Sequence, residues 1–197
     1  MELEARDTSF VPLHGRPAEG LVPAVFGQAR LEWVEMVCGP RVVQRVLAAL
    51  PRRDEAEARL LSKARWCPAE LVTELDETLQ EICGPSLSRL HQIGRLAARN
   101  SLTGIAAPTI LHRILRADAV LVLLFKSGAR TRYDELGACR GRLSSSSLVP
   151  LPQGWCDSVV GFLEEAIVMH GAFDPRVRTT SCQSRGDRDC TFDLQWC

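Results

Sequence analysis

Residues 176–196 read RVRTTSCQSRGDRDCTFDLQW, and their pattern decides the fold class. From Cys190 to Trp196 apolar residues alternate with polar ones, which is the period expected of a strand with one buried face. A polar segment around Gly186 separates this strand from the residues that begin at Arg176. The stretch therefore predicts a β-hairpin with its tip near Gly186.

The segments that precede this hairpin extend the pattern. Residues 154–170 carry apolar side chains at helical spacing and predict a long helix. Residues 129–148 are polar, contain Gly137 and Gly141, and predict another hairpin. The order hairpin, helix, hairpin indicates a small antiparallel sheet with a helix packed on it.

The N-terminal half has the pattern of a helical bundle. Cys-Gly-Pro occurs at 38–40 and again at 83–85, and each copy lies between two predicted helices. Glycine suits the position after a helix end, and proline suits the first turn of the next helix. One or two more helices are expected within 108–124. The fold class predicted is α+β, an N-terminal helical bundle packed on a small antiparallel sheet of two hairpins, with residues 1–21 as an irregular arm and 22–197 as a single domain.

Composition limits the classes of function. The 197 residues include 24 basic and 24 acidic side chains, and this balance argues against a protein that binds nucleic acid by charge. No apolar run approaches the ~20 residues of a membrane-spanning helix, and no signal peptide is recognisable. Eight cysteines without such a signal indicate a reducing compartment. We therefore expect a cytoplasmic domain without nucleic-acid partner or membrane span.

Three cysteines form the main candidate site. Cys182 and Cys190 flank the tip of the last hairpin, where a tight turn can hold two thiolates for a metal ion. Cys156 lies near the start of the helix over 154–170, where the helix dipole favours a thiolate. The alternative is that all three are small buried apolar residues, because free cysteine is among the most buried residue types.

Motifs of catalysis are absent from the sequence. It contains no Walker A loop, no GxGxxG, no HExxH and no GxSxG. The four histidines are dispersed. His112 lies between Leu111 and Ile114, which favours a half-buried core residue and leaves a ligand-binding role as the alternative.

Beyond these patterns, RVRTTSCQSRGDRDCTFDLQW resembles the C-terminal signature of the vinyl-4-reductase-type (4VR) domain. That domain belongs to a fold group with the haem-nitric-oxide-binding domains and the TRAPP transport subunits. Residues 22–197, with VFGQARLEWVEMVCGPRVVQRVL and RWCPAELVTELDETLQEICGP, resemble an uncharacterised and mainly myxobacterial family. The resemblance implies a helical half on a small sheet, enclosing a pocket for a small, mostly apolar molecule.

The resemblance also implies a metal site. Phenol-sensing members of the fold group hold a structural zinc ion with three cysteines and a glutamate, and the cysteines correspond to Cys156, Cys182 and Cys190. Thr179 stands where the glutamate is expected. The fourth ligand would then be Asp189, Cys197 or water.

Haem is the second cofactor that the resemblance suggests. Haem-binding members use a histidine on a helix in a region comparable to that of His112, and a tyrosine-serine-arginine strand motif that holds the haem propionates. The nearest stretch, residues 138–144, contains no tyrosine. We therefore expect zinc as the cofactor, if there is one, and not haem.

Three functions follow. The first is a non-enzymatic sensory or regulatory domain that binds a small apolar or aromatic ligand and signals through a protein partner or a homodimer. The second is a scaffold of the same fold with a filled core, whose outer surface would involve Trp33, Trp66 or Trp155. The third and least favoured is an enzyme that uses Cys156 as a nucleophile or a zinc ligand.

Overall fold

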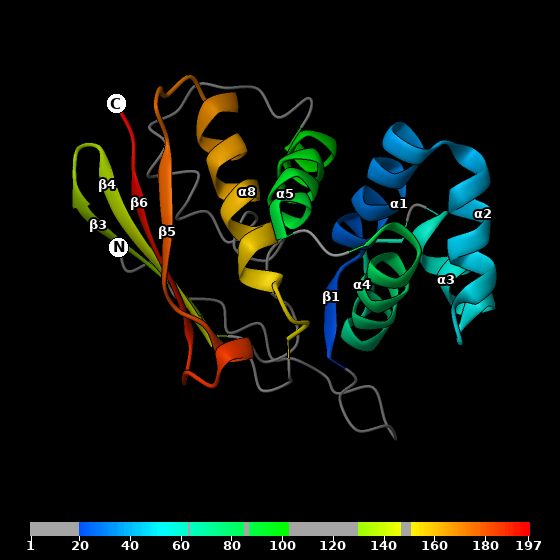
Figure 1. The fold of residues 1–197 in the computed structure, drawn as a ribbon. Helices are drawn as coiled ribbons and strands as arrows, with labels where there is room; N and C mark the ends of the chain where they lie inside the picture. The colour runs from blue at the N-terminus through cyan, green and yellow to red at the C-terminus, as the bar shows by residue number, and fades with distance from the viewer. Residues whose placement is uncertain (1–19, 63, 85–86, 103–129, 147–150) are drawn as a thin grey trace, which may run out of the picture.

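A four-stranded antiparallel sheet and six helices make up most of what the computed structural model describes, namely residues 20–62, 64–84, 87–102, 130–146 and 151–197. The helix α8 (Trp155–Met169) lies against one face of the sheet, α5 (Leu87–Leu102) packs on α8, and the other helices lie beyond α5 (Figure 1). This arrangement confirms the predicted α+β class. Among the described residues, no helix is long and apolar enough to span a membrane.

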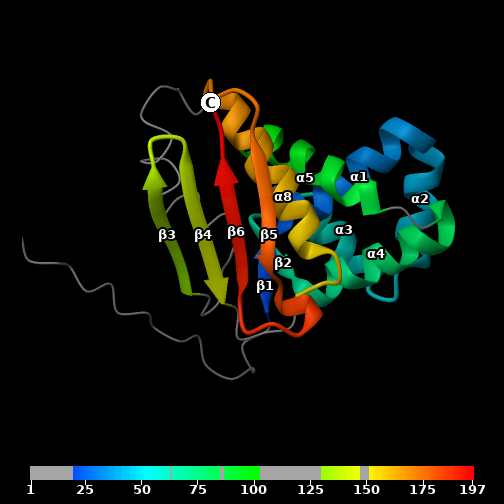
Figure 2. The same cartoon turned by 60° about the vertical axis from the view of Figure 1, so that its left-hand side comes forward.

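The sheet joins the two predicted hairpins. Its strands are β3 (Arg130–Gly137), β4 (Arg140–Ser146), β5 (Arg176–Ser181) and β6 (Cys190–Gln195), in the order β3-β4-β6-β5 (Figure 2). The hairpins meet where β4 pairs with β6 in antiparallel register, with Leu143 opposite Phe192. Both of these side chains are fully buried, so this pair is at the centre of the face that packs on the helices.

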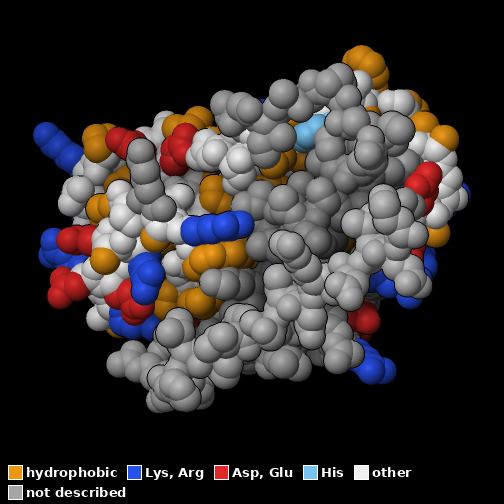
Figure 3. Space-filling model, turned by 180° about the vertical axis from the view of Figure 1, so that it is seen from behind, with side chains coloured by type: hydrophobic (Ala, Val, Ile, Leu, Met, Phe, Trp, Pro, Cys, Tyr) orange, Lys and Arg blue, Asp and Glu red, His pale blue; other side chains and the backbone are white. Residues whose placement is uncertain are grey.

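The opposite face of the sheet is charged. Arginines on β4 and β5 flank Asp193 of the central strand β6, and Arg142 holds the Asp193 carboxylate at 2.6 Å. Arg140, Arg176 and Arg178 line a shallow hollow of about 220 Å³ on this face. On the side of the molecule shown in Figure 3, acidic and basic side chains are interspersed around the margin.

The N-terminal helices include those that the apolar periodicity predicts. They are α1 (Ala24–Cys38), α2 (Pro40–Ala49), α3 (Arg53–Leu60) and α4 (Ala69–Cys83). Only α3 was not predicted, because its sequence RDEAEARL has no apolar stripe and buries just Ala56 and Leu60. The helices expected within 108–124 and most of the arm expected over 1–21 lie outside the described residues.

Two short strands in the N-terminal half of the chain pair with each other, and each one precedes a helix. β1 (Leu21–Pro23) precedes α1 and β2 (Trp66–Pro68) precedes α4, and they pair antiparallel with Val22 opposite Cys67. The Ala24 N–H donates to the Arg65 carbonyl (3.0 Å), and the Ala69 N–H donates to the Gly20 carbonyl (2.7 Å). The two bonds are equivalent, because a shift of 45 residues along the chain converts Ala24 to Ala69 and Gly20 to Arg65. Residues 20–39 and 65–84 are thus two copies of one strand-helix unit related by a local two-fold axis at Val22 and Cys67.

Candidate functional site: three buried cysteines

Three cysteine sulfurs meet between α8 and the tip of the last hairpin. The Sγ atoms of Cys156, Cys182 and Cys190 lie within 4.8 Å of one another, and all three residues are buried. Cys156 is the second residue of α8, Cys182 follows β5, and Cys190 begins β6. The structure therefore brings together the three residues chosen from the sequence, and their role as metal ligands remains a prediction.

The hairpin tip is folded so that Cys182 is held in place. Its backbone N–H donates to the Asp187 carboxylate at 2.6 Å, and its carbonyl accepts from the N–H groups of Arg185 and Asp187. A single 3₁₀ turn, Gln183–Arg185, ends at Gly186, whose φ of +94° is the left-handed conformation that glycine adopts without strain. These bonds fix one sulfur before any metal ion arrives.

Hydrogen bonds divide the thiols into a donor and an acceptor. The Cys156 thiol donates to the Cys190 sulfur at 3.4 Å, and the Gln183 N–H donates to the same sulfur at 3.3 Å. The bond from Cys156 and the backbone bond from Gln183 lower the pKa of Cys190 to about 7, although burial opposes them. Donation to Cys190 and burial raise the pKa of Cys156 far above its usual value. The site therefore favours a thiolate on Cys190, which is the form that binds soft metal ions.

None of the protein groups proposed as a fourth ligand joins the cluster. Asp189 accepts a hydrogen bond from the Ser181 hydroxyl at 3.1 Å. Cys197 is exposed and pairs through its backbone with Phe173, beyond the opposite end of β6. Thr179 is paired with Phe192 within the sheet. Among the described residues the cluster thus offers three candidate ligand atoms, so a tetrahedral metal ion held there would take its fourth ligand from water or a bound molecule.

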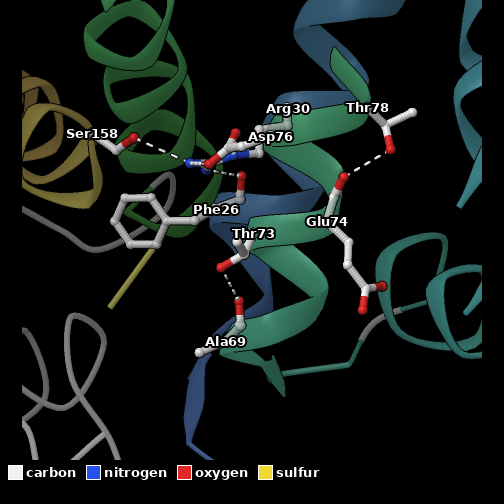
Figure 4. Close-up of polar contacts among 8 residues, drawn as sticks. All are labelled: Phe26, Arg30, Ala69, Thr73, Glu74, Asp76, Thr78 and Ser158. Carbon is white, nitrogen blue, oxygen red and sulfur yellow. Dashed lines mark hydrogen bonds and ion pairs between the residues drawn. The ribbon is translucent and has the colours of Figure 1, made fainter. Parts of the chain in front are cut away.

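A buried ion pair fixes the start of α8 beside this cluster (Figure 4). The guanidinium of Arg30, which is fully buried, binds Asp76 through Nε (2.6 Å) and Nη2 (2.9 Å). It also donates to the Phe26 carbonyl (2.9 Å) and to the Ser158 hydroxyl (3.5 Å). These contacts connect α1, α4 and α8. Since Ser158 lies two residues after Cys156, the ion pair also positions the turn that carries the cysteine.

Sequence reasoning missed this ion pair, although Arg30 carries a signal. It stands four residues after Phe26 and four before Val34, on the apolar stripe of α1, where a charged residue requires a buried partner. Nothing in the sequence identifies Asp76 as that partner. Trp155, which the scaffold interpretation would place on the outer surface, is fully buried with its ring 4.7 Å from the ring of Phe26.

In the part of the chain that the structure describes, two buried side-chain nitrogen atoms lack a hydrogen-bond partner. One is Nε1 of Trp155, next to Cys156. The other is Nε2 of His170, whose Nδ1 lies 2.7 Å from the Ala166 carbonyl. With Nδ1 as the donor to that carbonyl, Nε2 carries the free lone pair that an imidazole uses to coordinate iron or another metal. His112, the expected ligand-binding histidine, lies outside the described residues.

The strand motif expected for haem propionates is only partly present. The one tyrosine of the chain is Tyr133 on β3, which packs against the core, with its hydroxyl in contact with Gly141. At the following alternate positions the strand has Glu135 and Gly137 in place of serine and arginine. The described residues thus offer a tyrosine and an unpartnered imidazole nitrogen, but not the arginine that would pair with a propionate.

Comparison with known proteins identifies the fold. No protein-family model and no curated protein matches the sequence. An H-NOX protein from S. oneidensis in the Fe(II)NO ligation state has a TM-score of 0.63 at 13% identity, over 89% of this chain and 99% of that one. The Fe(II) unliganded H-NOX protein from K. algicida has a TM-score of 0.61 at 10% identity, over 89% and 97%. The chain therefore has the fold of the haem-nitric-oxide-binding (H-NOX) domains.

This result confirms the fold group inferred from the C-terminal signature. It lends no support to the finer resemblances, to the 4VR type and to a myxobacterial family. The expectation about cofactors was wrong for this fold. A further similar structure, with a TM-score of 0.63 at 11% identity over 88% of this chain and 99% of that one, is described as modulating haem redox potential through porphyrin distortion. Haem, rather than zinc, is the cofactor known in the solved structures that share the fold.

Proposed function

We propose that this chain is a sensory domain that binds a small, mostly apolar molecule inside residues 22–197 and signals through contacts with a protein partner or a second copy. The observation that carries the proposal is the similarity to H-NOX structures over 89% of the chain. At this level of identity the similarity concerns the fold, so the ligand has to be argued from the residues of this chain.

The interior near the start of α8 supports an apolar ligand with one polar acceptor. The rings of Trp155 and Phe26 lie 4.7 Å apart and are tilted by 49°, and the Phe26 ring lies 5.6 Å from that of Phe162. The unpartnered Trp155 N–H has no acceptor in this aromatic cluster. A buried donor without a partner costs about 1–3 kcal/mol, so an oxygen or nitrogen atom supplied by a ligand would recover that energy.

Haem is the first ligand to test, because it is large, mostly apolar and known in the fold. The full chain should be expressed with a haem precursor and its haem measured by absorption in the Soret region and as the pyridine haemochrome. About one haem per chain, with a spectrum that shifts on addition of nitric oxide, would support a gas sensor. His112→Ala and His170→Ala test the two candidate axial ligands, and His91→Ala, which removes a half-exposed partner of Glu164, is the control.

A chain purified without haem requires a second measurement. Apolar and aromatic compounds should then be screened for a rise in the midpoint of thermal unfolding, because a ligand that binds only the native state raises stability. If neither haem nor any compound binds, and light scattering shows a stable dimer in their absence, the scaffold interpretation replaces the sensor. Slow and equal alkylation of all thiols would argue against an activated catalytic cysteine.

We also propose that Cys156, Cys182 and Cys190 hold a soft metal ion in a structural role. Their proximity, their burial and the lowered pKa of Cys190 support this proposal. Such an ion would connect the start of α8 to the hairpin tip, two elements otherwise joined here by the Cys156–Cys190 hydrogen bond. Elemental analysis of the purified chain tests it.

A further inference from the structure

The cysteines of the two Cys-Gly-Pro tripeptides occupy equivalent places in the structure. Cys38 is the last residue of α1 and Cys83 is the last residue of α4, and these helices are the equivalent members of the two strand-helix units, which are offset by 45 residues. Both helices have 15 residues and begin directly after the paired strands β1 and β2. Because the strands pair around a two-fold axis and the helices have equal length, the two helix ends are equivalent positions that can meet at that axis.

The side chains at these ends are neighbours. Burial and the nearby Cys38 side chain raise the pKa of the Cys83 thiol. Cys38 is exposed to solvent and Cys83 is half-buried, so one thiol is open to a reagent and the other lies beside it. Arg45 of α2 and Arg89 of α5 are close enough to act electrostatically on Cys83, and Arg89 also donates to the carbonyls of Cys83 and Gly84 at 2.8 Å.

We propose that Cys38 and Cys83 form a reversible disulfide that joins the C-terminal ends of α1 and α4. The oxidant is a low-molecular-weight disulfide. The Cys38 thiolate attacks one of its sulfurs and releases the first small thiol, which leaves a mixed disulfide on Cys38. The Cys83 thiol then loses its proton to solvent and attacks the Cys38 sulfur, which releases the second small thiol. Two protein thiols are oxidised and one small disulfide is reduced to two thiols.

Position distinguishes this pair from the other cysteines. Cys139 and Cys197 are exposed as well, but neither is hydrogen-bonded to another cysteine in the described part of the chain. Cys67 is buried in β2, and burial raises the pKa of its thiol to about 12, which keeps it unreactive. The 156–182–190 cluster is buried beneath the hairpin tip. Cys38 and Cys83 are therefore the pair that a solvent oxidant reaches first.

The test is native oxidation of the full chain with oxidised glutathione, followed by alkylation, proteolysis and mass spectrometry. We expect a cross-link between the Cys38 and Cys83 peptides, at least about tenfold more abundant than any that contains Cys139 or Cys197, and reversed by dithiothreitol. Cys38→Ser and Cys83→Ser should each abolish it, and the remaining cysteine should appear as a glutathione adduct. Cys139→Ser is the matched control and should retain the cross-link.

One outcome would overturn the proposal. If the wild-type chain yields Cys38 and Cys83 only as separate glutathione adducts or as alkylated thiols, the sulfurs are not placed to bond. Circular dichroism of each variant shows whether its helices are intact, and both substitutions are at or near the surface. The result does not depend on haem or on a metal ion, so it separates this inference from the proposed function.

Discussion

Gly94 of α5 packs its Cα atom directly against the backbone carbonyl oxygen of Ser158 of α8. The relationship is repeated one turn along, where Gly161 of α8 lies against the His91 carbonyl of α5. The two helices thus touch backbone to backbone, and a methyl group at either glycine would overlap atoms that belong to a helix and cannot rotate away.

Replacement of Gly94 by alanine should separate α5 from α8 and lower the free energy of unfolding by about 3 kcal/mol, the upper part of the range for overpacked cores. Urea denaturation measures the change. Gly27→Ala is the matched control, since the added methyl meets only the flexible end of the Leu60 side chain. There the better helix propensity of alanine should offset the contact, to within about 1 kcal/mol. Equal effects at the two sites would contradict the packing argument.

The buried ion pair gives a second prediction. Asp76→Asn removes the charge that balances the fully buried Arg30 and should cost about 3–5 kcal/mol, as when one partner of a buried pair is lost. The exposed pair Arg53–Glu57 is the control, and Glu57→Gln should change stability by less than about 0.5 kcal/mol. If Asp76→Asn changes the free energy of unfolding as little as Glu57→Gln does, then Asp76 is not the group that stabilises the buried charge of Arg30.

Acid should weaken the contact between α5 and α8 through Glu165. Burial alone would raise the pKa of this carboxyl, but hydrogen bonds from Arg99 and Arg95, at 2.6 and 2.7 Å, outweigh it and hold the pKa below the ordinary 4.5. A carboxyl with a depressed folded-state pKa contributes stability that is present above pH 4.5 and is lost as the pH falls below it. The stability difference between wild type and Glu165→Gln should therefore shrink below pH 4.5. A stability difference between the two proteins that stays constant down to pH 3 would show that Glu165 is not the group whose protonation weakens the contact.

Metal content tests the cysteine cluster. If Cys156, Cys182 and Cys190 hold a metal ion, elemental analysis should find about one soft metal ion per chain, and a chelator should lower the midpoint of thermal unfolding. Cys182→Ala should abolish the metal, whereas Cys67→Ala, which changes another buried cysteine, should leave it in place. A wild-type chain that stays free of metal after incubation with a soft divalent ion would show that the cluster is only part of the core.

Periodicity explains which elements could be predicted. The hairpins and the helices α1, α2, α4, α5 and α8 have apolar patterns long enough to show a period. β1 and β2 have three residues each, too few to show alternation, so the sequence does not distinguish them from the helices that follow them. Strand order was out of reach because each hairpin signal is local, whereas the β4–β6 pairing joins segments about 50 residues apart.

The difference between local signals and long-range contacts also applies to the candidate sites. Cys182 and Cys190 could be expected to lie together because a single turn separates them, and Cys156 could be added by resemblance. The contact of Arg30 with Asp76 spans 46 residues, and no local pattern pairs them. The Cys-Gly-Pro repeat was visible in the sequence, but the contact between its cysteines depends on the two-fold pairing of strands that had not been predicted.

That two-fold pairing has the geometry of a closed, isologous dimer contained in one polypeptide. Two identical halves would present two identical faces, and a helix such as α8 could dock on either of them. Position 30 of the first copy is arginine, whereas the equivalent position 75 of the second is leucine; aspartate 76 in turn corresponds to Leu31. The pair that engages Ser158 thus exists on one side of the axis only. Arg30 and Asp76 are therefore positions at which the two copies differ and at which α8 is bound by one copy only.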